Sequence, residues 1–199
     1  MSIKSTTATS TMHWRLFLDL EVELVALSRY LEFNEQNFDA YSMRLASLLL
    51  SAGSEVDVVA KLLCKKLLPT SKPRHIGDYG RTIGSRIPEV GKFTVHMPKF
   101  GLSLNPWESW GGSSRKSPDW WKCHNQVKHE RNKHYNKANL KNTLNAVSGL
   151  FVLLLFLYEE MAVEGNLGPN PVLLTPAEEN TQGTMLNGAD YVWMYRLRS

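Results

Sequence analysis

The longest apolar run of the chain, residues 150–158, constrains the fold most strongly. It is nine residues long, whereas a helix that crosses a bilayer needs about 20 apolar residues, so we expect a helix buried inside the protein. No proline or glycine interrupts the sequence between Pro118 and Gly149. We therefore predict one or two collinear helices over residues 119–164. Their core-facing stripe has three- and four-residue spacing and consists of Leu140, Leu144, Val147, Phe151, Leu154 and Tyr158.

Two further apolar stripes with helical spacing precede this segment, over residues 14–32 and 38–67. The second stripe begins after the candidate cap Asn37 and is stopped by Pro69. It keeps its phase through Gly53, although a glycine inside a helix costs about 1 kcal/mol relative to alanine. Both stripes predict long amphipathic helices, so the helical bundle is expected to occupy about residues 12–68 and 118–164.

Residues 69–117 lack this periodicity and contain five of the nine prolines. We expect an irregular packed insert without a helix, and one short strand at "KFTVHM". The tail, residues 165–199, ends in the alternating "DYVWMYRLR", a candidate terminal strand that pairs with "KFTVHM". The predicted fold class is mainly α, as a single domain over residues 1–199. It is a bundle of three to four long helices with an irregular proline- and glycine-rich insert and at most a small β hairpin.

Positive charge is concentrated in the middle of the chain. Residues 61–141 carry seventeen basic and five acidic side chains, a net charge of +12, whereas the segments before and after each sum to −4. Such a block is suited to phosphate, because electrostatic attraction dominates nonspecific nucleic-acid binding. The same block can instead neutralise the acidic ends, within the chain or across a dimer. Both interpretations remain open.

The cysteines and the N-terminal residues indicate the compartment. The two cysteines, Cys64 and Cys123, show no CxxC spacing, and the first residues contain no apolar signal segment. We expect a reduced, cytoplasmic protein without membrane association.

The stretch "WWKCHNQVKHERNKHY", residues 120–135, places titratable groups directly before the apolar stripe. Tracing the core-facing side of a continuous helix backwards reaches His129 and Asn125, which predicts that both point into a shared cleft. Glu55 and Asp57 are candidate acidic partners for Lys128, His129 or Arg131. One interpretation is a structural network that ties two helices together. The other is a functional site, in which a histidine beside a carboxylate titrates near neutrality and cations stabilise a phosphate.

The six residues "HNQVKH", His124 to His129, resemble the RNxxxH motif of HEPN-superfamily proteins. The surrounding segments "YLEFNEQNFDAYS" and "SEVDVVAK", followed by the tryptophan pair and a long apolar helix, are similar to uncharacterised bacterial members. The resemblance covers about residues 12–68 and 118–164. It implies a compact helical bundle that often dimerises. Many members are metal-independent endoribonucleases of toxin–antitoxin and phage-defence systems.

By position in the motif, the resemblance implies His129 as acid/base group or phosphate contact and Asn125 as its orienting partner. Lys128 and Arg131 give electrostatic support. His124 stands where the motif has arginine, and imidazole lacks the permanent charge and bidentate phosphate grip of arginine. The candidate RNA contacts are His124, Lys122, Lys133 and Arg115. The implied partners are RNA, a second copy of the chain in a homodimer and a cognate protein. The alternative is a noncatalytic dimerising interaction module with a structural His/Arg/Glu network.

Other candidate sites have weaker support. Cys123 and the three histidines of the stretch invite a zinc site, but steps of five residues put the histidines on different helical faces, so we expect no metal and no cofactor. The tryptophans near positions 107–121 have two interpretations, stacking on bases or closing the core, and we favour the core. "GDYGRTIGSR" lacks the lysine and hydroxyl residue of a phosphate-binding P-loop.

Overall fold

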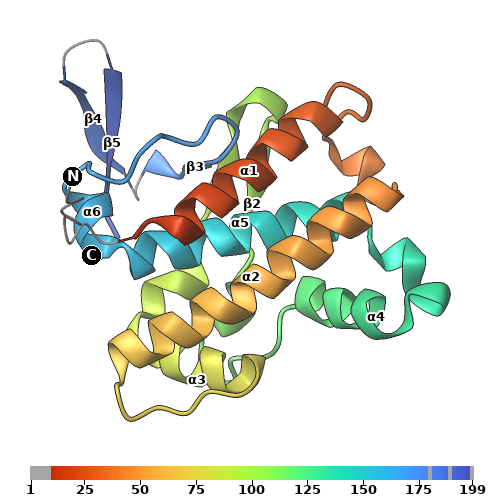
Figure 1. Cartoon of the computed structure of the whole chain (residues 1–199), viewed down its shortest axis with the longest axis horizontal. Coiled ribbons are helices and arrows are strands. Elements are labelled where there is room, and N and C mark those ends of the chain that lie inside the picture. The colour runs from red at the N-terminus through yellow and green to blue at the C-terminus, as the bar shows by residue number, and fades with distance from the viewer. Residues whose placement is uncertain (1–9, 179–180, 188–189, 198–199) are drawn as a thin grey trace, which may run out of the picture.

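The computed structural model describes residues 10–178, 181–187 and 190–197. It is mainly helical and contains four long helices, an insert of short elements and a small antiparallel sheet (Figure 1). The predicted fold class is therefore confirmed. The long helices are α1 (Met12–Leu27), α2 (Met43–Leu67), α4 (Asp119–His134) and α5 (Leu140–Leu157).

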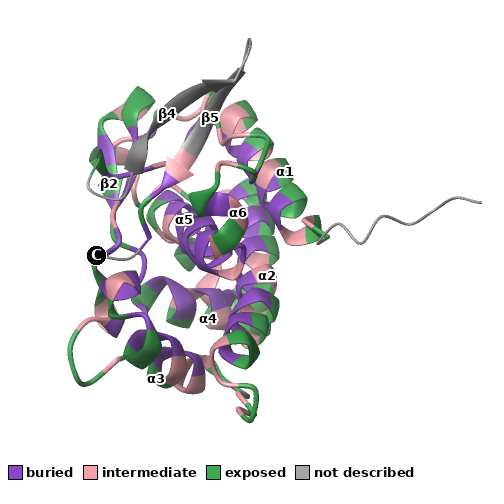
Figure 2. Ribbon diagram, turned by 90° about the vertical axis from the view of Figure 1, so that its left-hand side faces the viewer, coloured by how far each residue is buried: buried purple, intermediate pink, exposed green. Residues whose placement is uncertain are grey.

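Helix α5 forms the centre of the protein and packs most extensively against α2. Figure 2 shows α5 buried along most of its length. Helix α1 covers it on another side, where Phe17 stacks on Phe151 with ring centroids 5.3 Å apart. In the part of the chain that the structure describes, α5 alone is long and apolar enough to span a membrane, and most of it is buried inside the protein.

Helix starts are set by side-chain caps as well as by apolar stripes. Ser42 accepts a hydrogen bond from the Leu45 backbone N–H, so α2 begins at Met43 rather than directly after Asn37. The segment before it forms a short 3-10 helix, η1 (Glu35–Asn37), capped by Asn34. Gly53 lies in the middle of α2 and does not break it.

The prediction of collinear helices over residues 119–164 is wrong. Glu130 leaves the helical conformation, with φ −137° and ψ 51°, and a further 3-10 turn, η5 (Tyr135–Lys137), separates α4 from α5. The chain turns here because it bonds to a distant segment: the Leu140 N–H donates to the Ala40 carbonyl at 2.9 Å. A short helix, α6 (Glu159–Val163), follows α5.

The insert contains a helix that the sequence did not predict, α3 (Ile76–Arg86). Its glycines are explained by packing, because a Cβ at Gly80 would lie 2.9 Å from the Trp110 indole nitrogen. Asp78 caps the helix by accepting the backbone N–H groups of Arg74 and His75. The remainder consists of short elements: η2 (Pro88–Lys92), η3 (Pro98–Phe100) and η4 (Glu108–Trp110).

The strand at "KFTVHM" is confirmed as β1 (Val95–Met97), but its predicted partner is wrong. β1 lies between β2 (Leu102–Leu104) and β3 (Thr175–Pro176), both antiparallel. The alternating "DYVWMYRLR" segment forms β5 (Asp190–Tyr195), which pairs with β4 (Thr181–Asn187). The protein thus has a three-stranded sheet and a separate hairpin among its described residues, more β structure than the single hairpin expected.

A buried carboxylate attaches the tail to the bundle. Glu21 of α1 is only 2% exposed and accepts the backbone N–H groups of three consecutive residues, Val172, Leu173 and Leu174, at 2.8 to 3.0 Å. Charge-assisted hydrogen bonds of this kind are about twice as strong as neutral ones, which offsets the cost of burying the charge. Glu21 thus fixes residues 172–174, and the residues that follow them form β3, which pairs with β1.

Candidate functional site

Helix α4 has a narrow buried face and a wide exposed one. The buried face consists of Trp120, Trp121, His124 and Val127. Asn125 is half-buried, whereas Lys128, His129 and Arg131 are exposed. The prediction that His129 and Asn125 point into a shared solvent-reachable cleft is therefore wrong for His129, which lies on the outward face of α4. The projection failed because α4 does not continue the axis of α5, so the apolar phase of α5 does not carry over.

The histidine that enters the interior is His124, which is 2% exposed. Its ring fills the space that a side chain at Gly53 of α2 would occupy: a Cβ there would lie 2.3 Å from the imidazole Cδ2. The ring also packs against Trp121, with centroids 5.1 Å apart. His124 was a candidate RNA contact, and this burial removes it from the surface.

Burial controls the charge of His124. Removal from water, helped by the nearby Lys128 ammonium, lowers the pKa of the imidazole from 6.5 to about 4. The ring is therefore neutral at pH 7. Its Nδ1 is buried and has no hydrogen-bond partner among the described residues. His124 consequently cannot supply the cation that arginine provides in the HEPN motif.

The two candidate acids have partners outside α4. Glu55 pairs with His13 of α1. Asp57 accepts hydrogen bonds from the Tyr79 hydroxyl at 2.6 Å and from the Lys61 ammonium at 2.5 Å. The predicted pairing of these acids with Lys128, His129 or Arg131 is not formed.

Asp57 and Tyr79 instead join α2 to α3. Burial raises the pKa of the Tyr79 hydroxyl, and its bond to Asp57 raises it further, so the tyrosine stays protonated and donates. Asp57 also acts electrostatically on His124, whose pKa it raises slightly against the larger effect of burial. The acid therefore belongs to a structural junction of α2, α3 and α4.

The exposed side of α4 and the turn after it form a surface that we call the basic corner. Residues 119–141 hold six basic and two acidic side chains, a net charge of +4. This segment stands at one end of the molecule (Figure 1). The basic corner consists of Lys122, Lys128, Arg131, Lys133, Lys137 and Lys141, all exposed.

Two of these six cations have ion-pair partners on the same helix. Lys122 lies 2.8 Å from Asp119, and Lys133 lies 2.6 Å from Glu130. The other four form no ion pair with any described residue. Exposed ion pairs of this kind contribute little to stability, at most about 1 kcal/mol. Because the six cations outnumber the two acids, the basic corner keeps a positive electrostatic potential.

The remaining candidates lie elsewhere. Arg115 is half-buried against α3, where its guanidinium donates to the Gly84 carbonyl at 3.4 Å, so it is not part of the basic corner. The tryptophans close the core, as favoured from the sequence. The rings of Trp107 and Trp110 pack at a tilt with centroids 4.0 Å apart, and Trp120 donates its indole N–H to the Pro106 carbonyl.

The break between α4 and α5 creates a polar pocket that sequence reasoning missed. This junction pocket, of about 240 Å³, lies between the first turns of α4 and α5 and the loop that holds η4. Its polar lining includes Asn105, Glu108, Ser109, Asp119, Lys141 and Asn145, and Trp120 forms part of its wall. Lys141 contributes to both the junction pocket and the basic corner. No single motif predicts such a site, because its walls come from three separate segments.

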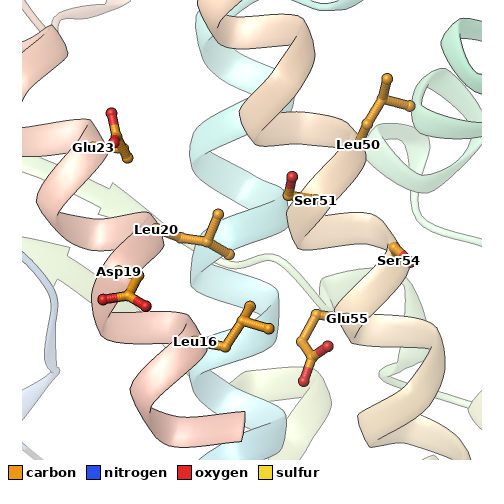
Figure 3. A pocket seen from close by; sticks show the side chains of 8 residues that line it. All are labelled: Leu16, Asp19, Leu20, Glu23, Leu50, Ser51, Ser54 and Glu55. Atoms are coloured by element: carbon orange, nitrogen blue, oxygen red, sulfur yellow. The ribbon is translucent and has the colours of Figure 1, made fainter.

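A second, more apolar depression runs between α1 and α2. This helical groove has a volume of about 560 Å³. Figure 3 shows Leu16 and Leu20 of α1 extending toward α2. Asp19, Glu23 and Glu55 add negative charge to its lining, and Ser51 and Ser54 add small hydroxyl groups.

Within the described ranges, no group of three or more His, Cys, Asp or Glu side chains is arranged to hold a metal ion. Comparison with models of protein families, with curated proteins and with solved structures finds no match to this chain. The candidate functional features of the protein are therefore the basic corner, the junction pocket and the helical groove.

Proposed function

We propose that the protein binds RNA through the basic corner. The observation that carries this proposal is the group of six exposed cations on α4, the turn after it and the start of α5, a segment that holds only two acids and stands at one end of the molecule. Cations that neutralise phosphates release condensed counterions, which supplies most of the free energy of nonspecific nucleic-acid binding. The resemblance of "HNQVKH" to the HEPN motif lies on the same helix and supports RNA rather than DNA as the ligand.

In this proposal the four unpaired cations contact phosphates, and His129 lies among them in an exposed position. An exposed imidazole beside Lys128 and Arg131 is suited to exchange a proton at a phosphate whose charge the cations stabilise. In RNA cleavage the 2′-oxygen would attack the adjacent phosphorus while a general base accepts the proton of the 2′-hydroxyl. The bond from phosphorus to the 5′-oxygen would break, and the 5′-oxygen would leave with a proton. Because His124 is buried and neutral, Arg131 must supply the cation for such a reaction.

Salt-dependent binding tests the proposal. We expect labelled single-stranded RNA to bind the whole protein in EDTA, with an affinity that falls steeply between about 50 and 200 mM salt. Lys128→Ala and Arg131→Ala should each lower the magnitude of the log–log salt slope by about 0.7, the contribution of one contact with a single strand. Lys92→Ala, an exposed lysine outside the corner, is the matched control and should leave the slope unchanged. Absence of RNA retention at low salt would overturn the proposal.

Catalysis is tested on the same samples. Incubation with total tRNA in EDTA should give cleavage that disappears in both His129→Ala and Arg131→Ala if the corner is a ribonuclease. Intact tRNA together with salt-sensitive binding would establish a binding protein and remove the nuclease hypothesis. Light scattering on the wild-type protein tests the homodimer that the HEPN resemblance implies.

The helical groove favours a second candidate function, a noncatalytic interaction module. Its leucines and acidic side chains suit a cationic amphipathic helix of a partner protein, which would lay its apolar face on Leu16 and Leu20 and pair its cations with Asp19. A synthetic leucine–lysine helix should bind, its leucine–glutamate counterpart should not, and Leu16→Lys should abolish binding. Val22→Lys, at an exposed position of α1 outside the groove, is the control. Equal binding by both peptides or self-association through the groove would reject this partner.

A further inference from the structure

The junction pocket offers a bound molecule more acceptors than donors. Carboxylates accept hydrogen bonds only, and an asparagine that donates one N–H elsewhere keeps its carbonyl oxygen as well as its second N–H for a ligand. Glu108 and Asp119 supply the carboxylates. The three asparagines of the lining all donate to other parts of the protein: Asn105 to Thr94 Oγ1, Asn142 to the Lys137 carbonyl and Asn145 to the Lys141 carbonyl.

Among these acceptors Glu108 is the most available. It is exposed and forms no ion pair with any described residue, whereas Asp119 is engaged by Lys122. The hydrogen bond and the charge of Lys122 hold the pKa of Asp119 below its usual range, and Lys141 acts in the same direction. The pocket therefore combines one free carboxylate with one ammonium, that of Lys141.

Ser109 also lines the pocket. Its Oγ is hidden from solvent and has no hydrogen-bond partner among the described residues. Rotation of this side chain toward the pocket would give a bound ligand one further hydrogen bond.

Size and hydrogen bonding together select the ligand. The pocket of about 240 Å³ is below the range of about 300 to 1,000 Å³ of sites for drug-sized ligands, so it fits a single base. Guanine is the base whose Watson–Crick edge carries two adjacent donor groups, N1–H and N2–H₂, beside an acceptor, O6. One carboxylate accepts from both donors while a cation contacts O6. Uracil presents one donor between two acceptors, and adenine and cytosine each present a single amino group.

We propose that the junction pocket receives an unstacked guanine of the RNA bound at the basic corner, with Glu108 accepting from N1–H and N2–H₂ and Lys141 contacting O6. This inference rests on the proposed function, since Lys141 belongs to both surfaces. Sequence-specific recognition of RNA commonly reads single-stranded bases on these edges. The corner then supplies affinity, and the pocket supplies base preference.

Oligouridines that contain one central G, A or C test the proposal by fluorescence anisotropy with the full chain. We expect about 10-fold tighter binding of the G-containing strand, the discrimination typical of one bidentate contact. Glu108→Gln should reduce this preference to less than about 3-fold. The same substitution removes a negative charge, so plain oligouridine should bind as well or slightly better. Glu35→Gln, an exposed acid in η1, is the matched control and should change neither value.

Equal affinity for all four strands, or a guanine preference that survives Glu108→Gln, would overturn the pocket assignment and leave RNA binding intact. Guanosine, which has no phosphate, separates the two proposals. Shifts of the Asn105 and Asn145 side-chain amide signals on titration with guanosine, absent with uridine, support the pocket even if no RNA is retained. In that case the proposed function fails while the base site stands.

Discussion

Helices α4 and α5 are neighbours in the sequence and similar in length, yet their burial is opposite. Fourteen of the eighteen residues of α5 are buried, but only four of the sixteen residues of α4. A helix buried on nearly every side determines the stability of the core, whereas one held by a few residues presents side chains to solvent. The titratable side chains of residues 120–135 therefore lie mainly on the surface, and the buried His124 is the exception.

The largest effect is expected from the centre of α5. Phe151 is fully buried and contacts the rings of Trp14 and Phe17, with centroids 6.0 and 5.3 Å away. Phe151→Ala should lower the free energy of unfolding by about 3 to 5 kcal/mol, measured by urea denaturation. A loss below about 1 kcal/mol would show that α5 is not the core element that the comparison requires.

Acid should destabilise the protein through His124, the buried residue of α4. Its pKa is about 4 in the folded protein and 6.5 when exposed, so between these values the unfolded chain binds more protons. The free energy of unfolding should therefore be highest above pH 6.5 and fall toward pH 4, by at most about 3 kcal/mol from this group. His124→Gln, compared with wild type by urea denaturation over this range, should reduce the dependence. His129→Gln, on the exposed face, removes one of the weaker contributions to the low pKa of His124 and should change the dependence much less.

A single added methyl group tests the contact between α4 and α2. Gly53→Ala would place Cβ within 2.3 to 2.7 Å of the His124 ring, and overpacking of this kind typically costs about 1 to 3 kcal/mol. In a His124→Ala background the same change should instead stabilise by up to about 1 kcal/mol, because alanine is the better helix former. Denaturation of the four proteins of this cycle gives the coupling energy. Additive effects would contradict the contact.

The smallest effect on stability is expected at the basic corner. Lys128→Ala and Arg131→Ala remove exposed side chains without ion-pair partners among the described residues, so each should change the free energy of unfolding by less than about 0.5 kcal/mol. Thermal denaturation measures this while RNA binding is measured in parallel. A large loss of stability in either variant would show that the basic corner is a structural network and not a set of cations exposed to solvent.

Much of the helical fold was predictable because its apolar stripes are periodic. The stripes located α1, α2 and α5, and Pro69 marked the end of α2 within two residues. Helix α3 was missed because Gly77, Gly80 and Gly84 suggested a loop. Gly80 and Gly84 are small because Trp110 and Arg115 pack against them, a tertiary cause that local sequence does not reveal.

The candidate site was predictable in composition and not in orientation. Residues 120–135 did prove to be helical over most of their length, and their cations are exposed. The break between α4 and α5 has no proline or glycine to mark it, and the chain after it is held by backbone bonds from residues 139–141 to residues 38–41. The sequence projection carried the core-facing side of α5 across that break into α4, and it therefore gave the wrong orientation for α4. The predicted pairing of Glu55 and Asp57 with α4 was wrong for the same reason.

The absence of a side chain at Gly53 also fixes the position of α4 along α2. Gly53 is the single glycine of α2, so the imidazole ring of His124 fits against α2 at this one position. Sliding or rolling of α4 would drive the ring against a neighbouring turn, and the helix is held at one setting. The backbone positions that carry its outward cations are consequently fixed by steric exclusion in the interior of the protein.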